Sequence, residues 1–186
     1  MNDLSKLKLL IDWKHPAFHK QTVRNNISQH LWLKKIRVHM LKSYNYTCAI
    51  CNCKVPVEKA SRSLHVHEVE EYDLDNLVCH LKKLELLCVN CHNIHHFKRA
   101  KAVFTQEQMV RLIEHFLDVN NCEFEDFVRC YNAREKQDIE LITARLDQDI
   151  VSHYHNGTFM YSVSKDVPFH DDIVAQLQKK GLLYEE

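Results

Sequence analysis

The chain has 186 residues, with 25 Lys and Arg balanced by 25 Asp and Glu, 14 His, 8 Cys and only 2 Gly. Gly157 and Gly181 cannot form the glycine clusters of Rossmann or P-loop nucleotide sites, and no apolar run has the length of a membrane span or signal peptide. These features predict a soluble cytoplasmic protein whose cysteines bind metal or stay reduced.

The balanced charge hides a difference between two halves of the chain. Residues 1–101 carry 17 Lys and Arg against 9 Asp and Glu, together with ten of the His, whereas residues 102–186 carry 8 against 16. A basic, His- and Cys-rich half favours contact with a polyanion or a metal. Segregation of charges between solvated helix faces is the simpler explanation, and it stays open here.

The basic half is expected to form an irregular arm, a basic helix, a cysteine knuckle, two short strands and the start of a helix. Trp32, Ile36 and Met40 recur at helical spacing, and the knuckle region carries three Cys and Pro56. An acidic loop at 70–76 separates the two strands. In chain order the elements cover residues 1–20, 28–42, 46–60, 64–69, 84–87 and 91 onward.

The acidic half is expected to be mainly helical. Thr105 with Gln108 is a capping-box pattern and predicts a helix start, while Asn156-Gly157 is typical of a helix end. Gly181 likewise follows a predicted last helix. The elements are a helix from 105, a helix from 124 to about 155, a strand at 158–163 and a helix at 171–180.

These elements predict an α+β fold that is mainly helical, with four parts along the chain. The last residues, 151–186, are interpreted as a partner-binding tail, a dimerisation element or a cap that completes the core. The parts are an arm and basic helix (1–45), a zinc-bearing core (46–101), an acidic helical region (102–156) and a C-terminal strand and helix (157–186).

Two CxxC motifs predict a structural zinc site. Cys48 and Cys51 form one, Cys88 and Cys91 the other, and 36 residues separate them. Each pair offers two thiolates from a tight turn, so that two pairs complete a tetrahedral site with no open position for chemistry. Cys53 is a less favoured substitute for Cys51. The remaining cysteines, Cys79, Cys122 and Cys130, are interpreted as ordinary buried or free thiols.

A group of histidines next to the second CxxC motif predicts a second, open metal site. His92 and His96 are four residues apart and share one face of a helix, and His67 lies on the preceding strand. Three neutral imidazoles leave room for water and a phosphate oxygen, which is typical of a catalytic metal site. The alternative is that these histidines are exposed to solvent or pair with the acidic residues at 68–75.

The residues around both motifs resemble an HNH nuclease, the ββα-metal class, in its zinc-bound treble-clef form. The chain is more specifically similar to a bacterial and phage HNH-like subgroup with a strand of the "HEVWEYD" type. The similarity covers about residues 22–150. The matching stretches are 46–51 (YTCAIC), 64–73 (LHVHEVEEYD) and 86–96 (LLCVNCHNIHH), with weaker echoes of the subgroup at Asn25 to Ile36 and His115 to Asn120.

The resemblance implies a ββα-metal/treble-clef core in which one divalent ion contacts the scissile phosphate while a neutral His activates water. Carried over by position, His67, His92 and His96 match the ion's ligands. Three features depart from the class. Glu68 stands where the general-base His is usual, Lys83 where an Asn braces the loop, and residues 70–75 (EEYDLD) replace a glycine-rich loop. Glu68 is interpreted either as the base or as an oxygen ligand of the ion. If Glu68 is a ligand, His65 or His95 is the base.

The leading hypothesis is a metal-dependent DNA endonuclease with structural Zn and a catalytic Mg, Mn, Ni or Zn ion. Its catalytic residues are His67, Glu68, His92 and His96. A catalytically silent zinc module that binds nucleic acid, or a protein partner through its acidic half, is the alternative, with a phage regulatory or anti-defence role. The third hypothesis is a purely structural zinc protein. We also expect that the protein can form a homodimer. The basic residues expected to contact phosphates are Lys34, Lys35, Arg37, Lys98, Arg99 and Lys101.

Overall fold

The computed structural model describes residues 4–12, 14–144, 153–154 and 156–185 of the chain. Within these residues it has eight α-helices and one three-stranded sheet, which confirms the predicted fold class, α+β and mainly helical. The helices are α1 (Val23–Asn26), α2 (Arg37–Ser43), α3 (Val57–Ser63), α4 (Val89–His95), α5 (Phe97–Val103), α6 (Gln106–Asn120), α7 (Phe124–Ala144) and α9 (His170–Lys179).

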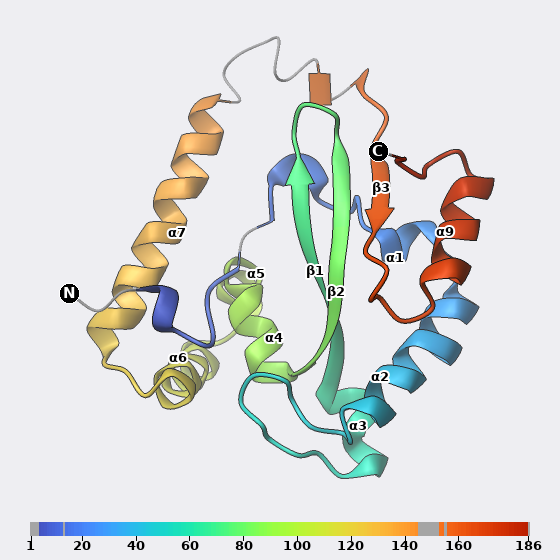
Figure 1. The fold of residues 1–186 in the computed structure, drawn as a ribbon. Coiled ribbons are helices and arrows are strands. Elements are labelled where there is room, and N and C mark those ends of the chain that lie inside the picture. Colours follow the sequence, from blue (N-terminus) through green and yellow to red (C-terminus); the bar gives the residue numbers. More distant parts are fainter. Residues whose placement is uncertain (1–3, 13, 145–152, 155, 186) are drawn as a thin grey trace.

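The centre of the fold is a long antiparallel hairpin of β1 (Leu64–Asp73) and β2 (Val78–Cys88). A short third strand, β3 (Met160–Val163), pairs in parallel with β2, so that the sheet order is β1-β2-β3. In Figure 1, α4 to α7 lie on one side of this hairpin, and α2 and α9 lie on the other. The hairpin therefore joins the two helical groups.

Both hairpin strands are longer than the sequence predicts. The prediction of an acidic loop at 70–76 is wrong for residues 70–73, which continue β1 after a bulge between Val69 and Glu70. The reason is that the Glu70 carboxylate is compensated: Lys14 Nζ lies 2.7 Å from its Oε2, and the Tyr72 hydroxyl donates to the same oxygen at 2.7 Å. A paired carboxylate can be buried in a strand where an unpaired one cannot.

The helix predictions agree with the structure where it describes the chain. Residues 29–43 are helical, beginning with a π-helical segment (Leu31–Ile36) that runs directly into α2. At the start of α6, Thr105 and Gln108 form both hydrogen bonds of a capping box. Helix α9 ends just before Gly181, whose φ of +67° suits glycine. The predicted continuation of α7 toward 155 lies largely outside the described residues.

One cluster of buried side chains runs through all four predicted parts of the chain. The arm is irregular, as predicted, apart from short 3₁₀ turns at Leu4–Lys6 and Pro16–Phe18, and it contributes Leu9 and Phe18 to the cluster. The C-terminal part contributes Tyr161, Ile173 and Leu177, each at most 1% exposed. Of the three interpretations of residues 151–186, the core-completing cap therefore fits the described residues 156–185.

Among the described residues, no helix combines the length and apolar character that crossing a bilayer requires.

Candidate metal centres

The four CxxC cysteines converge at the base of the hairpin. Cys48 and Cys51 lie in a turn that an isolated bridge between Thr47 and Lys54 closes. The backbone N–H of Ala49 donates to the Leu86 carbonyl at 2.8 Å, which fixes this knuckle against β2. Cys88 ends β2 and is the N-cap of α4, and Cys91 lies in the first turn of that helix. Two tight turns thus present two thiols each to a common point.

Their geometry fits a zinc ion. All four sulfur atoms lie within 4.8 Å of one another, and Cys51 Sγ is 3.7 Å from Cys88 Sγ. Ligands at the usual Zn–S distance of about 2.3 Å in a tetrahedron are about 3.8 Å apart. Three of the cysteines are buried and Cys51 is half-buried. The cluster can therefore hold zinc in a closed, structural site, as predicted from the spacing.

The sulfurs interact closely with one another. Hydrogen bonds from the thiols of Cys48, Cys88 and Cys91 lower the pKa of Cys51, whereas contacts with Cys48 and Cys51 raise the pKa of Cys88 and Cys91. Thiolate is the form that binds zinc, so that zinc binding would release the protons that the four sulfurs share. His115 of α6 adds a contact that the sequence analysis missed, with its Nε2 3.2 Å from Cys91 Sγ. Cys53 is exposed and lies outside the group of four, so that it does not replace Cys51.

The predicted histidine ligands also come together. His67 lies on β1, His92 in α4 and His96 directly after α4, and one nitrogen of each lies within 4.8 Å of those of the other two. The hairpin turns the chain back so that α4 passes next to β1, which brings the i, i+4 pair of the helix to the strand histidine. The side chain of His67 is only 5% exposed.

The imidazoles of His92, His95 and His96 are in the form that binds metal. Burial lowers the pKa of His92 to about 2 and that of His96 to about 4, with contributions from the neighbouring histidines. Burial also lowers the pKa of His95 to about 4. Neutral imidazole offers a lone pair that imidazolium lacks. These three imidazoles therefore need not release protons before they bind a cation at neutral pH.

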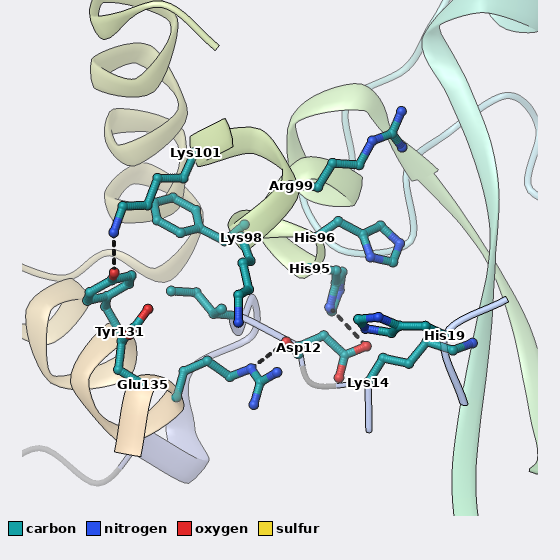
Figure 2. A pocket seen from close by; sticks show the side chains of 13 residues that line it. Asp12, Lys14, His19, His95, His96, Lys98, Arg99, Lys101, Tyr131 and Glu135 are labelled. Carbon is teal, nitrogen blue, oxygen red and sulfur yellow. Dashed lines mark hydrogen bonds and ion pairs between the residues drawn. The ribbon is translucent and has the colours of Figure 1, made fainter. Parts of the chain in front are cut away.

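A further group of ligands overlaps this one. Asp12, His67 and His95 also offer atoms within 4.8 Å of one another, and the sequence did not predict Asp12 as a ligand. Figure 2 shows the Asp12 carboxylate beside the ring of His95, in a hollow of about 320 Å³ that Lys14, His19 and His96 also line. No sequence pattern connects an arm residue to a helix more than 80 residues away, so only the fold reveals this neighbour.

Glu68 lies next to the cluster but differs from a general-base histidine. Its Oε1 accepts a hydrogen bond from the backbone N–H of Arg24 at 3.0 Å, and it lines the same hollow as His67 and His92. Burial, with a contribution from Glu70, raises the pKa of Glu68 to about 7. His65 stacks on His92 with ring centroids 4.8 Å apart. Both side chains are therefore near enough to remain candidates for the base.

The basic residues predicted to contact phosphates fall into two groups. Arg37 and Arg99 line one hollow of about 430 Å³ together with Trp32, His65 and His92. Arg24 and Arg62, which the prediction left out, line it too. The remaining predicted residues lie elsewhere: exposed Lys34 and Lys35 on the π-helical segment, and Lys98 and Lys101 on α5.

Several of these cations already have partners. Lys35 Nζ lies 2.9 Å from Asp172 Oδ2 of α9, and Lys101 Nζ donates to the Tyr131 hydroxyl at 2.7 Å. The Arg37 guanidinium donates to the carbonyls of Ser61 and Leu64 at 2.8 and 2.9 Å. Part of the predicted phosphate surface thus stabilises the fold, and the arginine-lined hollow is the stronger candidate surface.

Comparison with protein-family models, with curated proteins and with solved structures gives no significant match to this chain. The HNH resemblance therefore stays an inference from the motifs, and the function is argued from the residues.

Proposed function

We propose that this chain is an HNH-like, metal-dependent endonuclease that hydrolyses phosphodiester bonds of DNA. The observation that carries the proposal is the convergence of His67, His92 and His96 within 4.8 Å, on a hairpin strand and the helix that follows it. An ion held there by three imidazoles keeps open positions for water and a phosphate oxygen. When bound, it supplies charge stabilisation for the phosphate and for the leaving oxygen.

The adjacent zinc cluster supports this proposal by fixing the elements that carry the histidines. Cys88 and Cys91 lie at the junction of β2 and α4, and His92 follows Cys91 directly. A zinc ion bound to the four thiolates would therefore hold α4 at a fixed angle to the hairpin. Catalytic geometry requires such support, because small displacements of the reacting groups reduce rates strongly. We propose the ββα-metal/treble-clef architecture for residues 46–101 on this basis.

The arginine-lined hollow supports DNA as the substrate. Arg24 and Arg99 line it beside His65 and His92, so that a phosphate bound there would lie next to the histidine cluster. Arg24 also stacks over the Trp32 ring at 4.9 Å. Arginine guanidinium groups form bidentate hydrogen bonds with phosphate oxygens, and such contacts are independent of base sequence. This surface would orient the strand, while the base takes a proton from the attacking water.

Plasmid nicking tests the proposal. Zinc-loaded protein is incubated with supercoiled DNA and Mg²⁺, Mn²⁺ or Ni²⁺, beside His67→Ala and the matched control His39→Ala, an exposed histidine of α2. We expect wild type and His39→Ala to nick and His67→Ala to lose activity at least 100-fold. Glu68→Gln and His65→Gln, compared in the same assay, identify the base as the variant with the larger loss. Absence of nicking with every metal, or full activity in His67→Ala, refutes the assignment.

The alternative of a catalytically silent zinc module has its own support in the residues. Glu68 replaces the usual base and is engaged by the Arg24 backbone, and Lys83 pairs with Glu85 at 2.6 Å instead of bracing a loop. A protein that binds DNA with steep salt dependence but never nicks it would favour this module. A flat salt response would favour a protein partner.

A further inference from the structure

The N-terminal arm brings a carboxylate to the histidine cluster at distances that are too long for hydrogen bonds. Asp12 Oδ2 lies 3.5 Å from His67 Nε2 and 3.8 Å from His95 Nδ1. Typical N–H···O hydrogen bonds measure about 2.7–3.2 Å. By contrast, two ligands each about 2.1 Å from a tetrahedral ion are about 3.4 Å apart. The spacing of these atoms therefore suits ligands around a common cation better than direct partners.

His95 gives a second, independent observation. Both of its ring nitrogens are buried, and neither has a hydrogen-bond partner among the described residues. Buried polar atoms in native proteins are nearly always satisfied, and an orphan indicates a missing water, ion or ligand. The ring stacks on that of His67 with centroids 4.7 Å apart. A neutral imidazole without a partner beside another imidazole and a carboxylate is the arrangement that a transition-metal ion satisfies.

The arm is held in place on both sides of Asp12. Asn120 of α6 accepts from the backbone N–H groups of Lys8 and Leu9 at 2.8 and 2.9 Å. Arg134 of α7 donates to the carbonyl of Asp12 itself at 2.9 Å. After Asp12, Lys14 pairs with the buried Glu70. The backbone that carries the Asp12 carboxylate is thus held in place before any ion arrives, which reduces the entropy that binding must overcome.

We propose that Asp12, His95 and His67 bind a first-row transition-metal dication. His67 is the residue that this set shares with the set of His67, His92 and His96, so that the N-terminal arm forms part of the metal site. Two imidazoles and one carboxylate suit Zn²⁺, Co²⁺, Ni²⁺ or Fe²⁺, whereas Mg²⁺ and Ca²⁺ prefer all-oxygen sites. The inference deepens the metal-binding part of the proposed function. It rests on His67 holding an ion and does not require DNA cleavage.

Titration with Co²⁺ tests this ligand set directly. Zinc-loaded protein is titrated by calorimetry and by visible absorption, where nitrogen and oxygen ligands lack the intense thiolate charge-transfer band of cobalt in a cysteine site. We expect wild type to bind one Co²⁺ in addition to zinc. Asp12→Asn and His95→Ala should each weaken that binding at least tenfold. The matched control His39→Ala, an exposed imidazole of α2 outside this hollow, should bind like wild type.

The outcomes separate this inference from the proposed function. If Asp12→Asn and His95→Ala bind Co²⁺ as wild type does while His92→Ala and His96→Ala do not, the arm is no part of the site and the proposed ion stands. If wild type binds no Co²⁺, both the ligand set and the proposed ion are wrong. If Co²⁺ binds as expected but no metal supports nicking, the nuclease proposal fails and this inference holds. Zinc content and circular dichroism verify folding, with His95→Gln as a substitute for any unfolded His95→Ala.

Discussion

The cysteine cluster and the histidine cluster use consecutive residues of α4, but their surroundings differ. Cys91 is buried among three other thiols, whereas His92 lines hollows that also hold Arg24, Glu68 and Arg99. Four thiolates complete a tetrahedron and leave nothing for a substrate, while three imidazoles leave positions open. The comparison shows how one helix can be fixed at its first turn and carry a binding site one residue further on.

The largest expected effect follows from breaking the closed cluster. Cys91→Ser removes one zinc ligand, and structural zinc contributes about 10–16 kcal/mol in small zinc domains, comparable to the total stability of about 5–15 kcal/mol of a protein. We expect loss of stoichiometric zinc and of the cooperative thermal transition. Cys53→Ser, at an exposed thiol, is the control and should melt like wild type. A zinc-loaded, normally melting Cys91→Ser protein would contradict the cysteine site.

The corresponding change in the open cluster should affect ion binding and not the fold. His67→Ala removes the residue shared by both histidine-containing ligand groups, and His67 is not one of the residues of the hydrophobic cluster. We expect retained zinc, a cooperative transition, and Co²⁺ affinity reduced at least 100-fold, because a lost ligand costs at least as much as a lost outer-shell partner. Loss of zinc on this substitution would mean that the two clusters are one coupled centre.

His115 sharpens the comparison from the cysteine side. Its imidazole lies 3.2 Å from Cys91 Sγ, and outer-shell partners of metal ligands typically change affinity by about 10–100-fold. His115→Ala should therefore weaken zinc binding by about that factor in a competition assay with a chelator, while the Co²⁺ site is unchanged. Glu114→Ala, at the exposed neighbouring position on α6, is the control. Equal zinc affinity in both variants would show that the contact is incidental.

The smallest effect is expected at the basic surface. Arg99→Ala removes one cation from the arginine-lined hollow, so that DNA affinity should fall several-fold and the slope of log K against log salt should decrease by about one. Lys35→Ala is the control, because Asp172 already pairs with that lysine. If Lys35→Ala reduces the slope and Arg99→Ala does not, the DNA path runs along the π-helical segment Leu31–Ile36 instead of the hollow.

Local patterns predicted the parts of the sites that local structure builds. A CxxC turn places two thiols together whatever surrounds it, and a helix places residues i and i+4 on one face, which is why Cys48 and Cys51, and His92 and His96, could be found in the sequence. The capping box at Thr105 is equally local, and both of its hydrogen bonds form.

Contacts between distant segments were not predictable in the same way. Asp12 reaches His95 only because Asn120 and Arg134 hold the arm against two helices far along the chain. The burial of Glu70 in a strand depends on Lys14, more than 50 residues away. Arg37, expected at a phosphate, instead donates to two backbone carbonyls. The charge of a residue and its periodic spacing in the sequence indicate which interactions its side chain can make. The partner that it contacts depends on the fold.

Anomalous diffraction from a crystal of the zinc-loaded protein soaked in Co²⁺ tests the central claim most directly. The account predicts a zinc peak surrounded by Cys48, Cys51, Cys88 and Cys91, and a separate cobalt peak bound to His67 on the open side of α4. A single peak at the cysteines, or a cobalt ion away from His67, would contradict the claim that one helix carries a closed and an open metal centre.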